Sequence, residues 1–224
     1  MSRIADLYRK AKQIYHTDGF VSLVRRGFAF LLYCFFEYRT YYIYMDHLKD
    51  LPDLDGADFL PRIGNFTLKL VSSNEEADSL EVEGLEFRSQ VPYARDALDR
   101  GATASCIFVG HQLVHIGWVA TTQQAKDSLN EPPFTVDFSR NQSCSGGVWT
   151  SPQYRRTGLF SYSLLKRYEF LRDKGIAANL CAVAETNVSA QMGYGGSVPI
   201  PCAEGRYLRV LWWKSWRERP FPQD

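Results

Sequence analysis

The chain has 224 residues, of which 45% are hydrophobic and 23% charged, and its formal net charge is +1. This composition fits a globular protein of one domain with appendages or two small domains, and the near-neutral charge argues against a nucleic-acid partner. The five cysteines are scattered without a CxxC pair, and the N-terminus has no signal-peptide layout. These features indicate buried thiols in a reducing compartment and predict a cytoplasmic location.

The first 50 residues are rich in aromatic side chains and are expected to be helical. Gly19 ends a first helical stretch, and a second helix is expected over residues 20–45. Its apolar run, Phe28–Phe36, is too short to span a bilayer, which needs roughly 20 residues. Two accounts stay open. The run packs on protein, including a partner in a homo-oligomer, or residues 20–45 make peripheral contact with a membrane surface.

Residues 51–65 contain two prolines and several aspartates and glycines, so they are expected to form a linker. Alternating apolar residues then predict a strand at Phe66–Val71, and Ser73, followed by acidic residues, predicts a helix start. A further helix is expected over Tyr93–Arg100. Two strands, Ala104–Val109 and Gln112–Thr121, are separated by a short turn and predict a hairpin.

Residues 122–142 form a polar insertion with two consecutive prolines, and loops of this length are often functional or mobile. Gly146 and Gly147 lie just before Val148, separated from the insertion by three residues. Two glycines at the start of a strand predict a bulge or a close approach of another group to the backbone.

The stretch Val148–Leu165, VWTSPQYRRTGLFSYSLL, organises the rest of the chain. It predicts a strand that turns at Ser151-Pro152 and becomes a helix from about Thr157. A basic turn before a helix presents unpaired N–H groups and the positive end of the helix dipole, which together form an anion site. Gly158 would let a ligand approach the backbone closely.

This stretch resembles the pyrophosphate-binding motif of the GNAT superfamily of N-acyltransferases, V-x-P-x-x-[RQ]-x-x-G-[IL]-[GA], followed by a helix with paired leucines. The matching residues are Pro152, Tyr154, Arg155, Gly158, Leu159, Leu164 and Leu165. Phe160 departs from the pattern, since the family has Gly or Ala there. A ring at this position would either crowd the pyrophosphate or turn aside onto the sheet.

The resemblance covers about residues 66–214 by the order of elements. It implies an α/β (α+β) fold with a GNAT-like mixed, mostly antiparallel central sheet flanked by helices. We expect an N-terminal helical segment over 1–50, a linker over 51–65, the GNAT-like domain over 66–217 and a tail over 218–224.

The resemblance also implies acetyl-CoA, or another acyl-CoA, as co-substrate. The residues expected to bind it are Trp149, Thr150, Arg155, Arg156, Thr157, Gly158, Leu159, Phe160 and Asn187. In the family the side of the sheet next to the 122–142 insertion faces the acyl acceptor, so the insertion is expected to act as a substrate lid.

After the long helix, Ala177–Ala184 is expected to form a strand, and Asn187 and Ala190 match the family's N-x-x-[AS] pattern. Glycines beyond Ala190 predict a short helix there, because each costs up to roughly 1 kcal/mol in a helix interior. The end of the chain is expected to form one last strand at Arg206–Trp213 and a polar tail.

Acyl transfer to an amine needs a polarised carbonyl, a neutral amine and a proton for the leaving thiolate. A backbone N–H around Trp149–Thr150 is expected to polarise the carbonyl. The family's usual acid by position is Tyr194, unless Gly193-Tyr194 stands for its closing G-F. The first candidate base is Glu185 and the second is His115, although ordered water could relay the proton. Glu185 could instead cap a turn, and His115 could be a satisfied core side chain.

No metal is expected, because the two histidines of the 104–121 hairpin share no helical face and lack a third ligand. Two functions follow. The first is an acyl-CoA-dependent N-acetyltransferase that acts on a small-molecule amine or amino sugar by direct attack. The second is a catalytically degenerate GNAT-fold module that binds a ligand or associates with a membrane.

Overall fold

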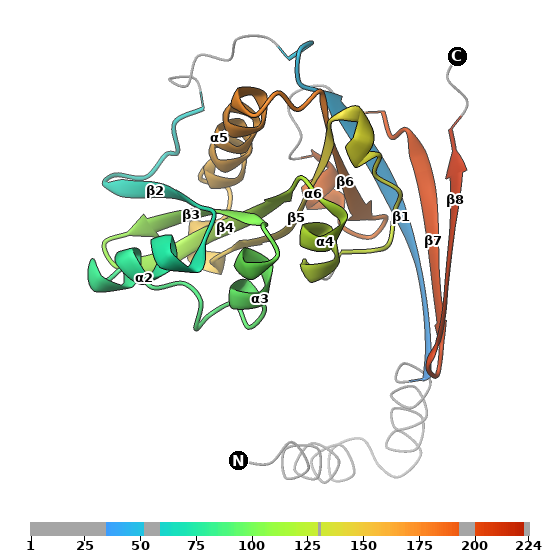
Figure 1. Ribbon diagram of the computed structural model, residues 1–224, viewed down its shortest axis with the longest axis horizontal. Coiled ribbons are helices and arrows are strands. Elements are labelled where there is room, and N and C mark those ends of the chain that lie inside the picture. The colour runs from blue at the N-terminus through green and yellow to red at the C-terminus, as the bar shows by residue number, and fades with distance from the viewer. Residues whose placement is uncertain (1–34, 52–58, 130, 193–199, 222–224) are drawn as a thin grey trace, which may run out of the picture. The chain divides into compact units, whose positions relative to one another are not determined.

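The structure, a computed structural model, describes residues 35–51, 59–129, 131–192 and 200–221. These residues fall into two compact units. The smaller unit contains residues 35–39 and 206–217, and the larger unit contains residues 40–205 and 218–221. The described residues form an eight-stranded sheet in the order β2-β3-β4-β5-β6-β1-β7-β8 (Figure 1).

Four consecutive strands form an antiparallel meander at the core of the larger unit. They are β2 (Phe66–Val71), β3 (Thr103–Val109), β4 (Gln112–Ala120) and β5 (Gln142–Thr150). The strand predicted at Phe66 and the hairpin predicted after residue 103 are therefore confirmed. Almost every residue of β3 and β4 is buried, which explains why both strands read as nearly continuous apolar sequence.

The prediction of a helix over residues 20–45 is wrong for its last ten residues, which belong to strand β1 (Phe36–His47). Tyr41–His47 of β1 pair antiparallel with β6 (Ala178–Ala184). The sequence of β1, FEYRTYYIYMDH, is rich in aromatic and β-branched residues, which favour a pleated, half-buried strand over a helix. Residues 20–34 of the expected helix lie outside the described residues.

The chain ends in a hairpin, not in the single strand and polar tail that were expected. Strand β7 (Ala203–Val210) and strand β8 (Trp213–Pro220) are separated by Leu211 and Trp212. The turn carries none of the Gly, Asn or Asp residues that usually mark a two-residue hairpin turn. The sequence across it therefore reads as one uninterrupted strand.

Helices cover both faces of the meander (Figure 1). The short helices α2 (Asn74–Val82), α3 (Ala94–Asp99) and α4 (Gln123–Ser128) lie on one face, and α5 (Leu159–Asp173) lies on the other. The Ser73 hydroxyl accepts a hydrogen bond from the N–H of Glu76 and so caps α2, as its sequence predicted. The 122–142 insertion contains helix α4 and a 3-10 turn at Phe138–Arg140.

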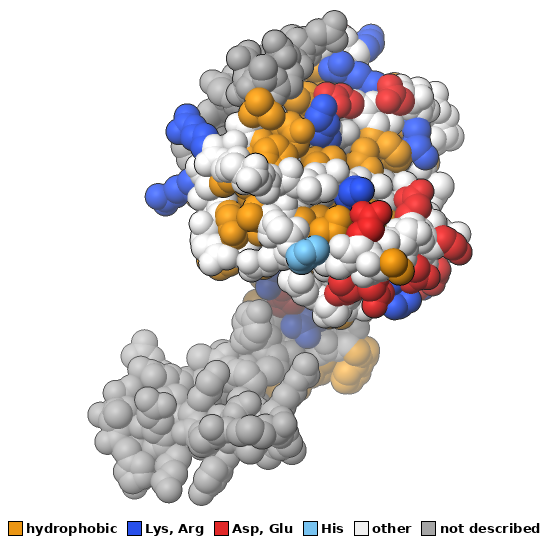
Figure 2. All heavy atoms as spheres, turned by 90° about the vertical axis from the view of Figure 1, so that its left-hand side faces the viewer, with side chains coloured by type: hydrophobic (Ala, Val, Ile, Leu, Met, Phe, Trp, Pro, Cys, Tyr) orange, Lys and Arg blue, Asp and Glu red, His pale blue; other side chains and the backbone are white. Residues whose placement is uncertain are grey.

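Helix α5 is held on the sheet by an apolar cluster formed by Leu48, Val119, Leu164, Tyr168 and Leu171. Acidic side chains gather at the lower right of the view in Figure 2. Helix α2 carries the acidic residues Glu75, Glu76 and Asp78. This mixed, mostly antiparallel sheet flanked by helices confirms the predicted GNAT-like fold class.

Candidate active site

A cavity opens where strands β5 and β6 part. The two strands pair in parallel only over Gln142–Cys144 and Ala178–Leu180. At this closed end the hydroxyls of Ser143 and Ser145 both donate to the Asn179 Oδ1 atom at 3.0 Å. Beyond it lies a cavity of about 960 Å³, which is lined by the rest of both strands and by the start of α5. Its volume falls in the range of small-molecule sites.

One end of the cavity is formed by the basic turn that precedes α5. After β5 the chain makes a 3-10 turn at Pro152–Tyr154 and then places Arg156 at φ +63° and Gly158 at φ +89°. Gly158 is the N-cap of α5 and has no side chain that could bond the first amides of the helix. Those amides, together with Arg155 and Arg156, give this end of the cavity the character of an anion site.

Most residues expected to bind the co-substrate line this cavity. They are Trp149, Thr150, Arg155, Arg156, Gly158, Leu159, Phe160 and Asn187. Thr157 does not line it. Instead its hydroxyl donates to the Tyr154 carbonyl oxygen at 2.6 Å and so tightens the turn. The structure therefore brings these residues together, and their roles in binding stay predictions.

Phe160, the departure from the family pattern, has two surroundings. It lines the cavity and also packs against the apolar cluster under α5. Part of the ring is thus removed from the path of a ligand that approaches the start of α5.

The two glycines of β5 form the predicted bulge, which is confirmed. The register between β4 and β5 shifts between Ile116 and Trp118, and Gly147 has φ +57°. A Cβ atom on Gly146 would collide with the carboxyl group of Glu131. One on Gly147 would lie 2.6 Å from the Tyr93 hydroxyl oxygen. Gly147 favours glycine because of its positive φ and the close Tyr93 and Trp118 side chains, and a side chain on Gly146 would displace the Glu131 carboxyl group.

Glu131 is the side chain that reaches this bulge, and it comes from the 122–142 insertion. Its Oε1 atom accepts a hydrogen bond of 2.6 Å from the Gly147 N–H. Burial raises the pKa of the Glu131 carboxyl to about 7, although the Gly147 N–H and the charge of Lys126 partly oppose that rise. A carboxyl group that lines a cavity and titrates near neutral pH is suited to proton transfer.

Two further polar groups lie close to the same bulge. Burial, and then the charge of Glu131, raise the pKa of the Tyr93 phenol, so it stays neutral and able to donate a hydrogen bond. The Tyr93 and Trp118 rings lie 5.9 Å apart, and the buried indole N–H of Trp118 has no partner within the described part of the chain. Polar groups thus converge on the bulge from β4, from the segment before α3 and from the insertion.

His115, the second candidate base, is fully buried and does not line the cavity. Its Nδ1 atom is 2.8 Å from the Thr150 hydroxyl oxygen. Burial, and secondarily the charge of Arg167, lower the pKa of His115 to about 3. The ring is therefore neutral at physiological pH, and its hydrogen bond to Thr150 links it to a residue of the cavity wall.

Glu185, the first candidate base, is exposed and does not line the cavity. Its Oε1 atom accepts a 3.5 Å hydrogen bond from the Tyr42 hydroxyl. Asn187 follows it, and its side-chain oxygen accepts from the Ala190 N–H at the start of α6 (Val188–Met192). That helix has five residues, as short as expected. The expected acid, Tyr194, lies outside the described residues.

Sequence reasoning missed Glu131, Tyr93 and Trp118. The only local signal was the Gly146-Gly147 pair, which predicted a close approach but not the group that approaches. Among the described residues, no three His, Cys, Asp or Glu side chains gather where they could hold a metal ion. No helix of residues 35–51, 59–129, 131–192 and 200–221 is long and apolar enough to cross a bilayer.

No protein-family model and no curated protein matches the chain. Among solved structures, it is similar to a functionally unknown conserved protein from Staphylococcus epidermidis ATCC 12228, with 15% identity and a TM-score of 0.46 over 84% of this chain and 67% of that one. A GCN5-related N-acetyltransferase from Kribbella flavida aligns at 14% identity and a TM-score of 0.39, over 70% of this chain. The chain spans 54% of the length of that structure.

Proposed function

We propose that this chain is an acyl-CoA-dependent N-acyltransferase that transfers an acetyl group to the amine of a small molecule or amino sugar. The observation that carries the proposal is the opening between β5 and β6. A basic turn with helix-start amides lies at one end of it, and the carboxyl group of Glu131 lies against the glycine bulge. The proposal therefore assigns the two ends of one cavity to the two substrates.

The basic turn suits the pyrophosphate of acetyl-CoA. Arg155 and Arg156 supply positive charge, and the first amides of α5 supply hydrogen-bond donors aimed along the helix axis. The Nε atom of Arg155 also lies 3.4 Å from the Thr150 carbonyl oxygen. This contact keeps the arginine on the cavity side of the turn.

The Thr150 N–H is suited to polarise the thioester carbonyl. The Ser151 N–H donates to Val114 on β4 at 2.9 Å. Because successive backbone N–H groups of a strand point to opposite sides, the Thr150 N–H points away from β4 towards the gap between β5 and β6. A fixed backbone donor at the position where charge develops stabilises the transition state at no cost in reorganisation.

Glu131 is suited to act as general base. In direct attack the amine loses a proton to the carboxylate while its nitrogen forms a bond to the carbonyl carbon. The carbon–sulfur bond then breaks, and the thiolate takes up a proton from a nearby donor. A base whose pKa is about 7 is half ionised at neutral pH, which is the condition for efficient proton transfer. Tyr194 stays the predicted acid, and the neutral phenol of Tyr93 is a second donor beside the bulge.

The alternative function is a GNAT-fold module that binds a ligand without turnover. The observation in its favour is Phe160, which lines the cavity where the family has Gly or Ala. Both functions predict binding of acetyl-CoA, so binding does not discriminate between them. Turnover does.

The test therefore has two stages. Isothermal titration of the full chain with acetyl-CoA should give saturable binding, which should weaken when Arg155 is replaced by Gln. A panel of amines and amino sugars is then incubated with acetyl-CoA, and release of free CoA thiol is followed. Thiol release that depends on both substrates supports an enzyme. Binding without release for any acceptor would favour the non-catalytic module, and absence of binding would contradict both functions.

A further inference from the structure

Exposed apolar side chains concentrate in the smaller unit. Seven of the 13 large hydrophobic residues exposed in the described part of the chain belong to this unit, which has only 17 described residues. The larger unit has 155 described residues and carries the other six. Single exposed apolar residues need no explanation, but a cluster of this density marks an interaction surface.

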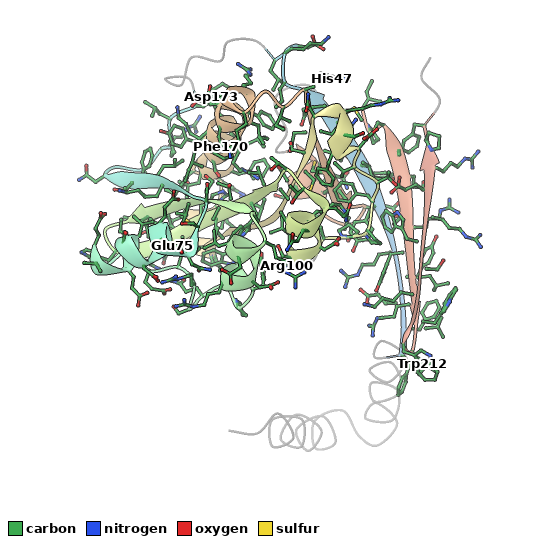
Figure 3. The ribbon with its side chains drawn as sticks, in the orientation of Figure 1. His47, Glu75, Arg100, Phe170, Asp173 and Trp212 are labelled. Atoms are coloured by element: carbon green, nitrogen blue, oxygen red, sulfur yellow. The ribbon has the colours of Figure 1, made fainter. Side chains whose placement is uncertain are left out.

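The cluster centres on the end of the β7–β8 hairpin, which we call the aromatic tip. It consists of Val210, Leu211, Trp212 and Trp213 together with Phe35 and Phe36. Trp212 is 85% exposed and Trp213 is 55% exposed. The Trp212 side chain lies at the end of the hairpin (Figure 3). The Leu211 N–H donates to the Phe35 carbonyl oxygen at 2.6 Å, so both parts of the tip are held together.

The turn carries apolar side chains at the cost of a strained backbone conformation. Leu211 has φ +56°, a conformation in which the Cβ atom of an ordinary residue is crowded. Two-residue hairpin turns normally use Gly, Asn or Asp at such a position. Here a bulky apolar residue occupies it and is followed directly by two tryptophans. Gly, Asn or Asp would cost less backbone strain at this turn. The apolar residues found there therefore suit the tip to contact with another molecule or a membrane surface.

Positive charge surrounds the aromatic tip. Residues 206–217 contain Arg206, Arg209, Lys214 and Arg217 and no acidic residue, and residues 35–39 add Arg39 and Glu37. Five basic residues and one acidic residue give the described residues of this unit a formal charge of +4, compared with +1 for the whole chain. Glu37 lies 2.7 Å from Arg39 and 3.0 Å from Arg209, which fixes both guanidinium groups beside the tip.

We propose that the aromatic tip inserts into the headgroup region of an anionic lipid bilayer. Tryptophan rings partition to the membrane–water interface, where one edge is apolar and the N–H stays hydrated. Lysine and arginine next to such rings are attracted to negatively charged headgroups. The exposed tryptophans therefore suit the apolar part of the membrane interface, and the basic residues around them suit the anionic headgroups.

The size of the tip argues against a protein partner. A specific protein interface uses about 20–30 residues a side. Within residues 35–39 and 206–217 the tip offers six apolar side chains, which is far fewer residues than such an interface uses. A bilayer accommodates a small apolar projection without a matching pocket.

The test is vesicle flotation of the full chain. We expect the wild-type protein to float with mixed phosphatidylcholine–phosphatidylserine vesicles and much less with pure phosphatidylcholine. The variant Trp212→Ser with Trp213→Ser should lose at least about tenfold in partitioning, because it removes the two rings that insert. Lys214→Gln should lose about fivefold and only on anionic vesicles.

The matched control is Val82→Ser with Ile200→Ser, which also removes two exposed apolar side chains, 90% and 88% exposed, from the larger unit. It should float like the wild type. Circular dichroism checks that both double variants fold. The second measurement, made on the wild type, is quenching of tryptophan emission by phospholipids with brominated acyl chains, which requires insertion.

Several results would overturn the proposal. One is a wild-type chain that neither floats with anionic vesicles nor shows quenching. Another is that the tryptophan double variant floats as the wild type does. The lipid contact would then lie in another segment of the chain. A third is that light scattering shows the wild type as a dimer and the double variant as a monomer, while the wild type binds no vesicles. That result would make a second copy of the chain the partner of the tip.

Discussion

Strand β5 separates two buried polar groups that have opposite surroundings. Glu131 reaches the glycine bulge from the cavity, whereas His115 on β4 lies in the core and is hydrogen-bonded to the Thr150 hydroxyl. Burial disfavours the charged form of both groups. It raises the pKa of Glu131 to about 7 and lowers the pKa of His115 to about 3.

The difference shows that a shifted pKa alone does not indicate a catalytic group. The shift of His115 is the larger, yet this ring has no access to a ligand and stays neutral throughout the physiological range. Glu131 combines a shift towards neutral pH with a place on the cavity wall. Access, combined with a pKa near the working pH, is what makes Glu131 a candidate base.

The strongest way to break this comparison is Glu131→Gln. The amide keeps the shape of the side chain but accepts no proton, so turnover should fall by about 10²–10⁴-fold while acetyl-CoA affinity stays within a factor of about two. The measurement is steady-state thiol release beside isothermal titration. Glu83→Gln, at an exposed position after α2, is the control and should be silent. Loss of turnover in Glu185→Gln but not in Glu131→Gln would restore Glu185 as the base.

The cavity side of β5 can also be tested at Gly158. Gly158→Val places a branched side chain at φ +89° and at the start of α5, next to the Pro61 backbone. Acetyl-CoA affinity should fall by about 10²-fold. The free energy of unfolding should fall by about 1–2 kcal/mol, because a residue with a Cβ atom is strained at positive φ. Gly64→Val is the matched control, since Gly64 has open space around it and no positive φ. If Gly158→Val and Gly64→Val bind acetyl-CoA with equal affinity, the anion site does not lie at Gly158.

The core side is tested by His115→Ala. This change leaves a cavity in the sheet and removes the partner of the Thr150 hydroxyl, so the free energy of unfolding should fall by about 2 kcal/mol. Urea denaturation at neutral pH measures the loss. The pH dependence of turnover should stay as in the wild type, because His115 is already neutral. A shifted pH profile with unchanged stability would instead place His115 in the reaction.

The smallest effect, and the one that sharpens the comparison most, is the pH dependence of stability. Glu131 keeps its proton in the folded state up to about pH 7, whereas the unfolded carboxyl releases it near 4.5, so its contribution to stability falls as pH rises across that window. His115 stays neutral down to about pH 3, whereas the unfolded ring is protonated below 6.5, so its contribution falls as pH decreases. Between about pH 4.5 and 6.5 the two slopes oppose each other.

Each variant should therefore expose the slope of the other group. The free energy of unfolding of Glu131→Gln, minus that of the wild type, should increase as pH rises. The same difference for His115→Ala should decrease as pH rises. Each difference should change by about 1.4 kcal/mol per pH unit at most. Urea midpoints at several pH values measure both. Parallel curves for the two variants would contradict the opposite protonation behaviour of the two sites.

Much of the larger unit could be predicted because its signals are local. The β3–β4 hairpin carries its own turn, α2 carries its own cap, and the basic turn before α5 lies within 18 consecutive residues. Such features depend on neighbours a few positions away, so the sequence displays them directly. The bulge of β5 belongs to this class as well, because two adjacent glycines mark it.

The features that were missed depend on distant partners. Strand β1 is stabilised by β6, more than 130 residues later in the chain, and its aromatic sequence suits an apolar helix face as well as a strand. Glu131 is one acidic residue in a polar insertion until the fold places its carboxyl group against Gly147. The β7–β8 turn was missed for the opposite reason, since its residues contradict the usual local rule.

The position of β1 in the sheet has a consequence for synthesis of the chain. Among the strands of the described residues it is translated first, whereas its neighbours β6 and β7 are translated among the last. At about 5–20 residues per second, about 7–28 s pass between the emergence of Phe36–His47 and that of Ala178–Ala184. During this interval a segment rich in tyrosine lacks its strand partners on the ribosome. The nascent chain is therefore expected to depend on chaperones that cover this segment until β6 arrives.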